Sequence, residues 1–345
     1  MKKQKILFCL FSVLLVAIIL CLPVFAKEKQ NYDINDLKLY VGGMPFGARI
    51  TSRGLTVVKF SDTEGEEASS AYLAGIRQGD IIIKINGVNI NTIEEFVGMI
   101  NKSNGNELKI SVLRNGKELL FNVTPKYSMD DGKYKTGIWV KDSTSGIGTV
   151  TFIDPGTNAF GGLGHAICDT TTGRIVPFSR GTVMDVSING VIKGQTGVAG
   201  ELKGSFEAKK IGNLIKNCEC GVFGILAESS VNSPEGLINV CQRENVKEGK
   251  AYIWCTLDQN GPQKYEIEIT SIDPSSTSTK NFRVRVTDEK LLEKSGGIVQ
   301  GMSGSPIIQN GKLVGAVTHV LINDPTQGYG IFIENMLNAM PSTLK

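Results

Sequence analysis

The sequence predicts a mainly β protein, and three observations lead to that prediction. The chain has 345 residues, of which 40 are glycine and 7% are aromatic, a composition suited to many turns and short strands. Its length favours two folded units over one. From Gly137 onward, short alternating apolar runs follow one another with turn residues between them, which is typical of a barrel or a sandwich.

The charge balance argues against a nucleic-acid-binding surface. The formal net charge is +3, close to neutral for this length, and no basic stripe interleaves with aromatic residues. We therefore expect no nucleic acid among its partners.

Residues 1–30 predict a transmembrane anchor or a signal segment. Three lysines within the first five positions precede an uncharged run over residues 6–26, which is long enough to span a bilayer as one helix. The lysines should stay on the cytoplasmic side, so the rest of the chain is expected to be exported. Small residues at the end of the run also fit a cleaved signal peptide, but the run is long for one, which favours the uncleaved anchor.

Residues 36–126 predict a small domain of mixed α and β structure. The stretch "AYLAGIRQGDIIIKINGVNINTIEEFVGMI" (71–100) combines a helical turn, a tight loop, a strand, an Asn-Gly turn and a helix. A second Asn-Gly pair, at 115–116, predicts another hairpin. This region resembles a PDZ domain. The resemblance implies a groove in which a peptide adds a strand to a sheet edge.

The segment "GGMPFGARI" (42–50) lies where PDZ domains have the loop that binds a terminal carboxylate. Its glycines permit the tight backbone that a cluster of N–H groups needs. We therefore expect Phe46, Gly47 and Ala48 to bind a peptide end. A plain connecting loop is the alternative, because the usual pattern is matched only loosely.

A polar linker at 126–136 leads to a second domain, expected at 137–345. Runs such as "GTVMDVSINGVIKG" (181–194) and "NFRVRVTD" (281–288) predict short strands. Helices are expected only at 211–218 and 289–296.

The hexapeptide "GMSGSP" (301–306) predicts a nucleophile loop. A serine hydroxyl attacks only when a base takes its proton and donors await the oxyanion. Gly301 and Gly304 permit a tight turn around Ser303, so the amides of Gly301 and Ser303 could form an oxyanion hole. The loop resembles that of chymotrypsin-like serine peptidases, which implies a double β-barrel. Ser305 is the rival nucleophile, and a turn without chemistry is the other alternative.

The chain has two histidines that could serve as the base. His165 lies in "FGGLGHAICD", far upstream of the serine, where a two-barrel peptidase places its base. His319 lies on the predicted strand after Ser303. We expect His165 to be the base and His319 to be structural.

The group that orients the base is open between several carboxylates. Asp169, Asp185 and Asp288 lie between His165 and Ser303 in sequence, whereas Asp324 follows the serine. Asp169 could simply brace its loop. Asp288 ends a predicted strand fifteen residues before Ser303, closer than in chymotrypsin-like enzymes. We nevertheless choose Asp288 as the orienting carboxylate, because it lies at the end of a strand that leads into the nucleophile loop.

The cysteines do not predict a disulfide framework or a metal site. Five lie beyond the N-terminal run, an odd number, and "CEC" (218–220) lacks the spacing of a zinc site. Free or buried thiols are the main expectation, with one or two disulfides or a metal as alternatives. No cofactor is expected.

The order of these features resembles the stage IV sporulation protein B family of serine peptidases. An N-terminal anchor, a PDZ domain, "FGGLGHAICD" and "GGIVQGMSGSPIIQNGKLVGAVTHVLINDPTQGYGIFIE" carry the resemblance. It implies Ser303 as nucleophile, His165 as base and Asp288 in or near the site. It also implies export into the space between the two forespore membranes, self-cleavage, and cleavage of a membrane-bound regulator of an intramembrane protease. That step triggers activation of a late sigma factor during sporulation.

Two other functions stay open. The protein could be a catalytically inactive, membrane-tethered scaffold that binds peptides through its PDZ domain. An HtrA-type stress protease is disfavoured, because there the PDZ domain follows the catalytic domain.

Overall fold

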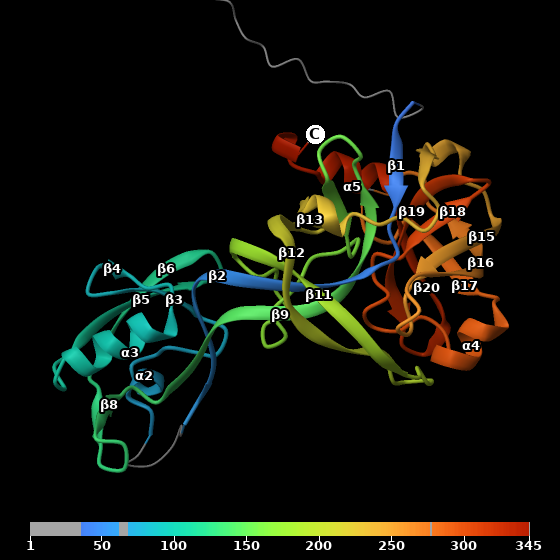
Figure 1. Cartoon of the computed structure of the whole chain (residues 1–345). Coiled ribbons are helices and arrows are strands. Elements are labelled where there is room, and N and C mark those ends of the chain that lie inside the picture. The colour runs from blue at the N-terminus through green and yellow to red at the C-terminus, as the bar shows by residue number, and fades with distance from the viewer. Residues whose placement is uncertain (1–35, 62–67, 277, 345) are drawn as a thin grey trace, which may run out of the picture. The chain divides into compact units, whose positions relative to one another are not determined.

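The computed structural model describes residues 36–61, 68–276 and 278–344. The predicted anchor at residues 1–30 lies outside these ranges. Within them, no helix is long and apolar enough to cross a membrane. The described part is mainly β, as predicted, and the element labels below are those of Figure 1.

One ring of strands is closed by hydrogen-bonded pairs that run from β2 through β9, β10, β13, β12 and β11 back to β2. Apolar side chains on its inner faces form one buried cluster that includes Phe46, Phe160 and Leu214. The strands are β2 (Pro45–Phe60), β9 (Ile138–Ile153), β10 (Ala159–Gly162), β11 (Phe178–Ile192), β12 (Glu201–Cys218) and β13 (Gly221–Leu226).

A second ring of strands closes in the same way, from β15 through β16, β17, β20, β19 and β18 back to β15. Its core includes Ile253, Ile267 and Phe332. The strands are β15 (Gly249–Cys255), β16 (Gln263–Ile272), β17 (Phe282–Val286), β18 (Pro306–Gln309), β19 (Lys312–Leu321) and β20 (Asp324–Phe332).

Short elements join the two rings. β1 (Lys38–Val41) pairs with β9 of the first ring and with β14 (Leu237–Val240), which in turn pairs in parallel with β19 of the second. Helix α5 (Ile333–Ala339) adds Ile333 and Met336 to the apolar cluster beneath these strands.

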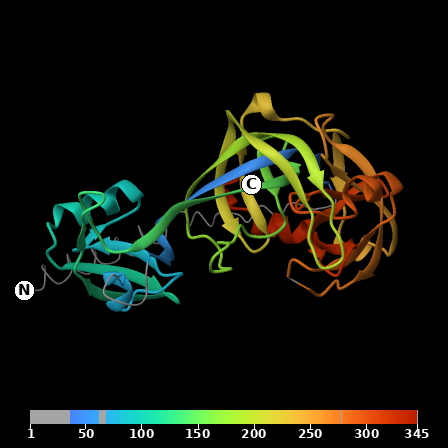
Figure 2. The ribbon, with the colours of Figure 1, turned by 90° about the horizontal axis from the view of Figure 1, so that it is seen from below.

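The long hairpin of β11 and β12 reaches the second ring, as Figures 1 and 2 both show. At its end, the Gly194 amide donates to the Ser295 carbonyl at 2.9 Å, and the Leu202 amide donates to the Gln300 carbonyl at 2.8 Å. The hairpin therefore contacts the chain just before the predicted nucleophile loop.

The PDZ-like unit has its own core around Ile82, Phe96 and Ile110. Its long helix begins at a capping box, in which Thr92 and Glu95 each bond the other's backbone amide. Both Asn-Gly turns are confirmed, with positive φ at all four residues. The elements are α2 (Ser70–Leu73), β3 (Ile81–Ile85), β4 (Val88–Asn89), α3 (Ile93–Lys102), β5 (Leu108–Arg114), β6 (Lys117–Val123), β7 (Lys126–Ser128) and β8 (Lys133–Lys135).

Two strands cross the domain boundaries that the sequence predicts. The first part of β2 belongs to the first ring, whereas Leu55 and Thr56 pair with β3 of the PDZ-like unit. Likewise, β9 pairs with residues 56–60 at its beginning and with residues 45–51 further on. The PDZ-like unit therefore includes strand residues from beyond position 126.

Of the two helices expected in the second domain, one is confirmed. Helix α4 covers Glu289–Ser295 and ends at Gly296, which has a φ of 72°. The helix expected at 211–218 is wrong, because this segment forms the end of β12 and pairs with β13. Its apolar spacing fits either a helix or a strand. Hydrogen-bonded pairing with β11 on one side and β13 on the other makes it a strand.

Candidate active site

The predicted nucleophile loop is a tight turn that leads into β18. Gly301 and Gly304 both have a φ of 96°, a backbone conformation that favours glycine. A Cβ atom at Gly304 would overlap the backbone of Leu163, in the segment that precedes His165. The loop and the histidine segment therefore lie in direct contact, and only glycine fits between them.

Strand β9 holds the nucleophile loop from the first ring. The Thr149 amide donates to the Ser303 carbonyl at 2.9 Å, and the Thr149 hydroxyl donates to the Gly301 carbonyl at 2.8 Å. The Thr151 hydroxyl donates to the Gly304 carbonyl at 2.7 Å. These bonds fix the backbone on both sides of Ser303.

The two serines of the loop have different surroundings. The Ser303 hydroxyl is partly exposed and donates to the Thr318 carbonyl of β19 at 2.7 Å. Ser305 is fully buried, and its hydroxyl donates to the Met302 carbonyl at 2.7 Å. Ser305 closes the turn from within, so Ser303 is the serine that a substrate can reach.

His165 follows a constrained stretch of backbone. Leu163 has a φ of 65° and Gly164 a φ of 66°, and such a value is unusual for leucine. Strained backbone of this kind clusters at functional sites. Gly164 packs against Thr318, the residue whose carbonyl accepts the Ser303 hydroxyl. This contact brings His165 to the strand beside the predicted nucleophile.

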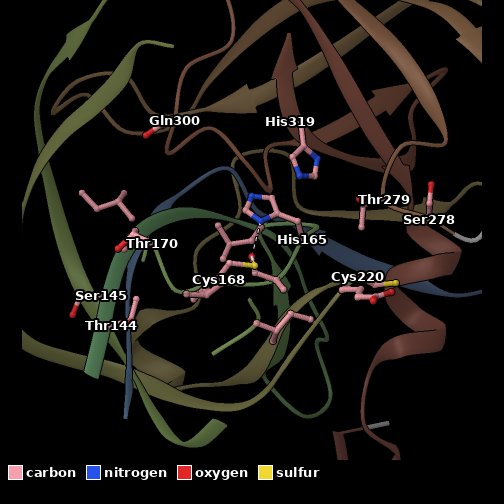
Figure 3. Close-up of a pocket in the computed structure, with 17 residues that line it drawn as sticks. Thr144, Ser145, His165, Cys168, Thr170, Cys220, Ser278, Thr279, Gln300 and His319 are labelled. Atoms are coloured by element: carbon pink, nitrogen blue, oxygen red, sulfur yellow. Dashed lines mark hydrogen bonds between the residues drawn. The ribbon is translucent and has the colours of Figure 1, made fainter. Parts of the chain in front are cut away.

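The second histidine lies at the same place. The ring centroids of His165 and His319 are 5.0 Å apart, and the ring planes are inclined by 37°. Figure 3 shows the two rings next to each other among the residues that line a pocket. The sequence predicted that His319 is structural, and its ring lies beside that of His165, the predicted base.

Both imidazoles are held in the neutral form. Burial lowers the pKa of His165, although the bond of its Nδ1 to the Ala166 carbonyl at 2.9 Å acts in the opposite direction. Burial lowers the pKa of His319 to about 4, and the charges of His165 and Lys280 add to the effect. A neutral imidazole is the form that accepts a proton.

The candidate carboxylates bond groups other than the histidines. Asp288 caps α4 by accepting from the Lys290 and Leu291 amides, and it also accepts from the Glu266 amide. Among the described residues it has no bond to His165, and its role in the site stays a prediction. It orders the helix that leads into the nucleophile segment.

Asp169, Asp185 and Asp324 likewise serve local structure. Asp169 is 5% exposed and accepts from two amides of its own loop and from the Lys141 ammonium group at 2.6 Å. This is the loop brace considered as an alternative. Asp185 accepts from the adjacent Val186 amide, and Asp324 braces its own turn.

The predicted oxyanion amides belong to Gly301 and Ser303. Within the described residues, neither N–H donates to a protein acceptor, whereas the amides of Met302, Gly304 and Ser305 all do. The two amides are thus available to a ligand, as an oxyanion hole requires.

A pocket of about 720 Å³ opens beside the histidines (Figure 3). His165 and His319 line it, while Ser303 lies outside the lining because its hydroxyl turns toward Thr318. Glu219 is the one carboxylate among the lining residues. The rest are mainly apolar or uncharged polar side chains.

The prediction of a carboxylate-binding loop at residues 42–50 has to be corrected. Residues 45–50 form no loop but the first part of β2, where Phe46 is fully buried and Gly47 and Ala48 pair with β9 and β11. They belong to the first ring, and the side chains of Phe46 and Ala48 face its core. The glycines that suggested a loop instead allow close packing, since a Cβ at Gly47 would overlap the ring of Phe206.

The structure offers another edge for a peptide in the PDZ-like unit. Residues 138–141 of β9 pair with β2 on one side, and no strand pairs with their other edge among the described residues. The side chains of Ile138 and Val140 pack against the buried cluster to which Phe96 and Ile100 of helix α3 belong. An unpaired edge beside a helix is the geometry of a PDZ groove.

The sequence reasoning missed the threonines of β9. Thr149 and Thr151 look like ordinary members of an alternating strand, and no local pattern reveals that they bond the nucleophile loop.

The cysteines at 168, 218, 220, 241 and 255 are free. The described residues contain no cluster of three or more side chains suited to a metal ion.

Family models match both parts of the chain. A model described as SpoIVB peptidase S55 matches residues 132–337, and a PDZ-domain model matches residues 62–114.

Curated relatives match over shorter stretches. The putative zinc metalloprotease LL2128 of Lactococcus lactis subsp. lactis (strain IL1403) is 36% identical over 107 residues, which are 30% of this chain and 24% of that protein. Zinc metalloprotease RasP of Geobacillus kaustophilus (strain HTA426) is 39% identical over 64 residues, 19% of this chain and 15% of that protein. The chain thus spans at most a quarter of either relative.

Solved structures share low similarity with the chain. The active form of the Rv3671c protease from M. tuberculosis has 14% identity and a TM-score of 0.34, covering 56% of this chain and 72% of that one. The PDZ domain of the SdrC-like protein from Listeria monocytogenes has 21% identity and a TM-score of 0.23, covering 27% of this chain and 93% of that one. Neither score establishes the fold.

Proposed function

Because the chain belongs to the SpoIVB peptidase S55 family and is a serine peptidase, we propose that it is an exported endopeptidase of spore formation. It cleaves itself and then a regulator of an intramembrane protease, a step that triggers late sigma-factor activation. Its N-terminal segment anchors it in the membrane, and its domains act in the space between the two forespore membranes. The order of motifs described above supports this role.

The observation that carries the proposal is the meeting of the Ser303 loop with His165. The two rings of strands act as the two barrels of a chymotrypsin-like peptidase, with His165 on the first and Ser303 on the second. The Gly304–Leu163 contact and the bonds from β9 bring these groups together.

Acylation follows from this geometry. The bond of His165 Nδ1 to the Ala166 carbonyl requires a proton on Nδ1, so Nε2 is the nitrogen that accepts. The Ser303 hydroxyl leaves the Thr318 carbonyl, gives its proton to Nε2 and attacks the scissile carbonyl. The amides of Gly301 and Ser303 then donate to the oxyanion. The imidazolium returns the proton to the leaving amine.

The PDZ groove in this proposal is the free edge of β9 at residues 138–141, beside α3. A peptide end or segment that binds there would extend the sheet of the PDZ-like unit. Its chemistry is that of an unstructured protein segment, and the substrate itself or the chain's own N-terminal region fits this description.

A catalytically inactive scaffold is the second candidate, favoured by one observation. Among the described residues, no carboxylate bonds His165, and the Ser303 hydroxyl bonds a backbone carbonyl instead of the histidine. Such a protein would bind peptides without cleaving them.

One experiment separates the two functions. The full chain is purified in detergent and followed on a gel over time, beside a Ser303→Ala variant purified in the same way. The peptidase proposal expects the wild-type chain to shorten and the variant to persist. Equal stability of both chains, with retained peptide binding, would favour the scaffold. Equal shortening would point to a contaminating protease and remove Ser303 from the reaction.

A further inference from the structure

Within the part of the chain that the structure describes, the proposed base His165 has a single hydrogen-bonding partner. Its Nδ1 bonds the carbonyl of the next residue, Ala166, at 2.9 Å. A neutral carbonyl can fix the tautomer of the ring, but it stabilises the charged imidazolium less than a carboxylate does. Because one bond to an adjacent residue leaves the ring free to tilt about that contact, another group has to define its plane.

His319 lies where such a group would act. Its ring centroid is 5.0 Å from that of His165, in a tilted arrangement typical of packed rings. His319 comes directly after Thr318 in the chain. The Thr318 carbonyl accepts a hydrogen bond from the Ser303 hydroxyl, and the Thr318 side chain packs on Gly164. His319 thus belongs to the strand that touches both the nucleophile and the histidine segment.

The Nδ1 atom of His319 is buried and has no hydrogen-bond partner among the described residues. A buried polar atom without a partner typically costs about 1–3 kcal/mol. Such a cost in a native structure calls for an explanation, and function is a common one.

We infer that His319 is a positioning residue, whose ring packs on His165 and holds Nε2 of the base toward Ser303. The inference rests on the proposed peptidase function. His319 itself exchanges no proton with the substrate. It limits the tilt of the base and keeps water from its face.

The charge state of His319 suits this role. Burial, the nearby His165 and the Lys280 ammonium group lower the pKa of His319 to about 4, so it stays neutral when His165 becomes charged. Lys280 lies over the Tyr329 ring at 5.1 Å. The other titratable groups around the shared pocket are Glu219, Cys168 and Cys220. A second cation beside the imidazolium would oppose proton transfer, and a neutral ring avoids this.

The test uses the full chain in detergent and a fluorophosphonate probe, which needs no knowledge of the peptide substrate. The Ser303 oxygen forms a bond to phosphorus, fluoride leaves, and the serine proton passes to His165. We compare His319→Ala and His319→Phe, measuring the maximal labelling rate, the half-saturating probe concentration and the pH profile. Ile322→Ala is the control, since that side chain is exposed at the end of the same hairpin.

We expect His319→Ala to lower the maximal rate about 10–100-fold, because small displacements of a catalytic group have effects of this size. Its acid limb should move to higher pH, since water reaching His165 would raise the pKa of that ring. Phenylalanine keeps the packed ring and the burial. His319→Phe should therefore retain most of the rate and the wild-type pH profile.

Three outcomes would overturn the inference. Equal labelling by wild type and His319→Ala would remove the positioning role. A change in the half-saturating probe concentration alone, with the maximal rate unchanged, would make His319 a residue that contacts the substrate. Complete loss in both variants, with normal melting temperatures, would make His319 the base. If the wild-type chain itself fails to label, the proposed function fails instead.

Discussion

The proposed nucleophile and the proposed base of this site are held in different ways. The Ser303 loop is fixed by three hydrogen bonds from Thr149 and Thr151, all to backbone carbonyls. The His165 ring has one bond to its neighbour and otherwise rests on packing. Hydrogen bonds thus fix the backbone of the proposed oxyanion hole, whereas ring packing and burial fix the orientation of the proposed base.

The largest expected effect breaks the nucleophile side. Ser303→Ala should lower the cleavage rate by a factor on the order of 10⁶, since loss of the serine removes the attacking group. Ser305→Ala is the matched control. It removes one buried bond to the Met302 carbonyl, so it should cost about 1 kcal/mol of stability and little rate. Self-cleavage rates and melting temperatures of both variants check this. A larger loss of cleavage rate in Ser305→Ala than in Ser303→Ala would make Ser305 the nucleophile.

On the base side, His165→Ala should match the serine variant, on the order of 10⁶ in rate. Burial lowers the pKa of His165, and the neutral ring is the working form. Activity should therefore persist below the ordinary histidine pKa of about 6.5 and fall only at lower pH. The rate of fluorophosphonate labelling against pH measures this limit. A limit above pH 7 would contradict the burial argument.

A smaller effect sharpens the role of the hydrogen bonds. Thr149→Val removes the hydroxyl that donates to the Gly301 carbonyl but keeps the shape of the side chain. We expect about a tenfold loss of maximal rate, because Gly301 carries one of the oxyanion amides. Thr157→Val is a control at an exposed threonine of the turn after β9. Equal rates for both variants would make the Thr149 bond a matter of stability alone.

The smallest effect is expected at Asp288. Its carboxylate caps α4, and asparagine is an equally good cap, so Asp288→Asn should keep the melting temperature and most of the rate. Asp169→Asn, which weakens the pair with Lys141, serves as the comparison for a loop brace. A loss of roughly 10⁴ in the Asp288 variant alone would instead assign it the orienting role of a triad carboxylate.

The sequence predicted the parts of the site whose signal is local. Glycine at 301 and 304 around Ser303 reflects the positive φ values that the turn needs, so the loop could be recognised. The Asn-Gly turns and the capping box of α3 are local in the same sense. The position of His165 far upstream of Ser303 suggested its role as the base, and the family resemblance implied the same role.

The failures concern long-range pairing. Gly47 lies in a glycine-containing segment that suggests a loop, yet pairing with β9 and β11 makes it a strand. The segment 211–218 has spacing that suits a helix, yet pairing with the distant β11 as well as with β13 makes it a strand. The contact between His319 and His165 joins residues more than 150 positions apart, which periodicity cannot reveal.

The strands that cross the predicted boundaries also bear on how the protein unfolds. β9 supplies an edge to the PDZ-like unit at residues 138–141 and holds the nucleophile loop through Thr149. Melting of the PDZ-like unit would free one end of the strand that the peptidase part needs, so the two parts share cooperativity. A fragment that ends at residue 126 would lack this strand, and its stability would understate that of the same unit within the whole chain.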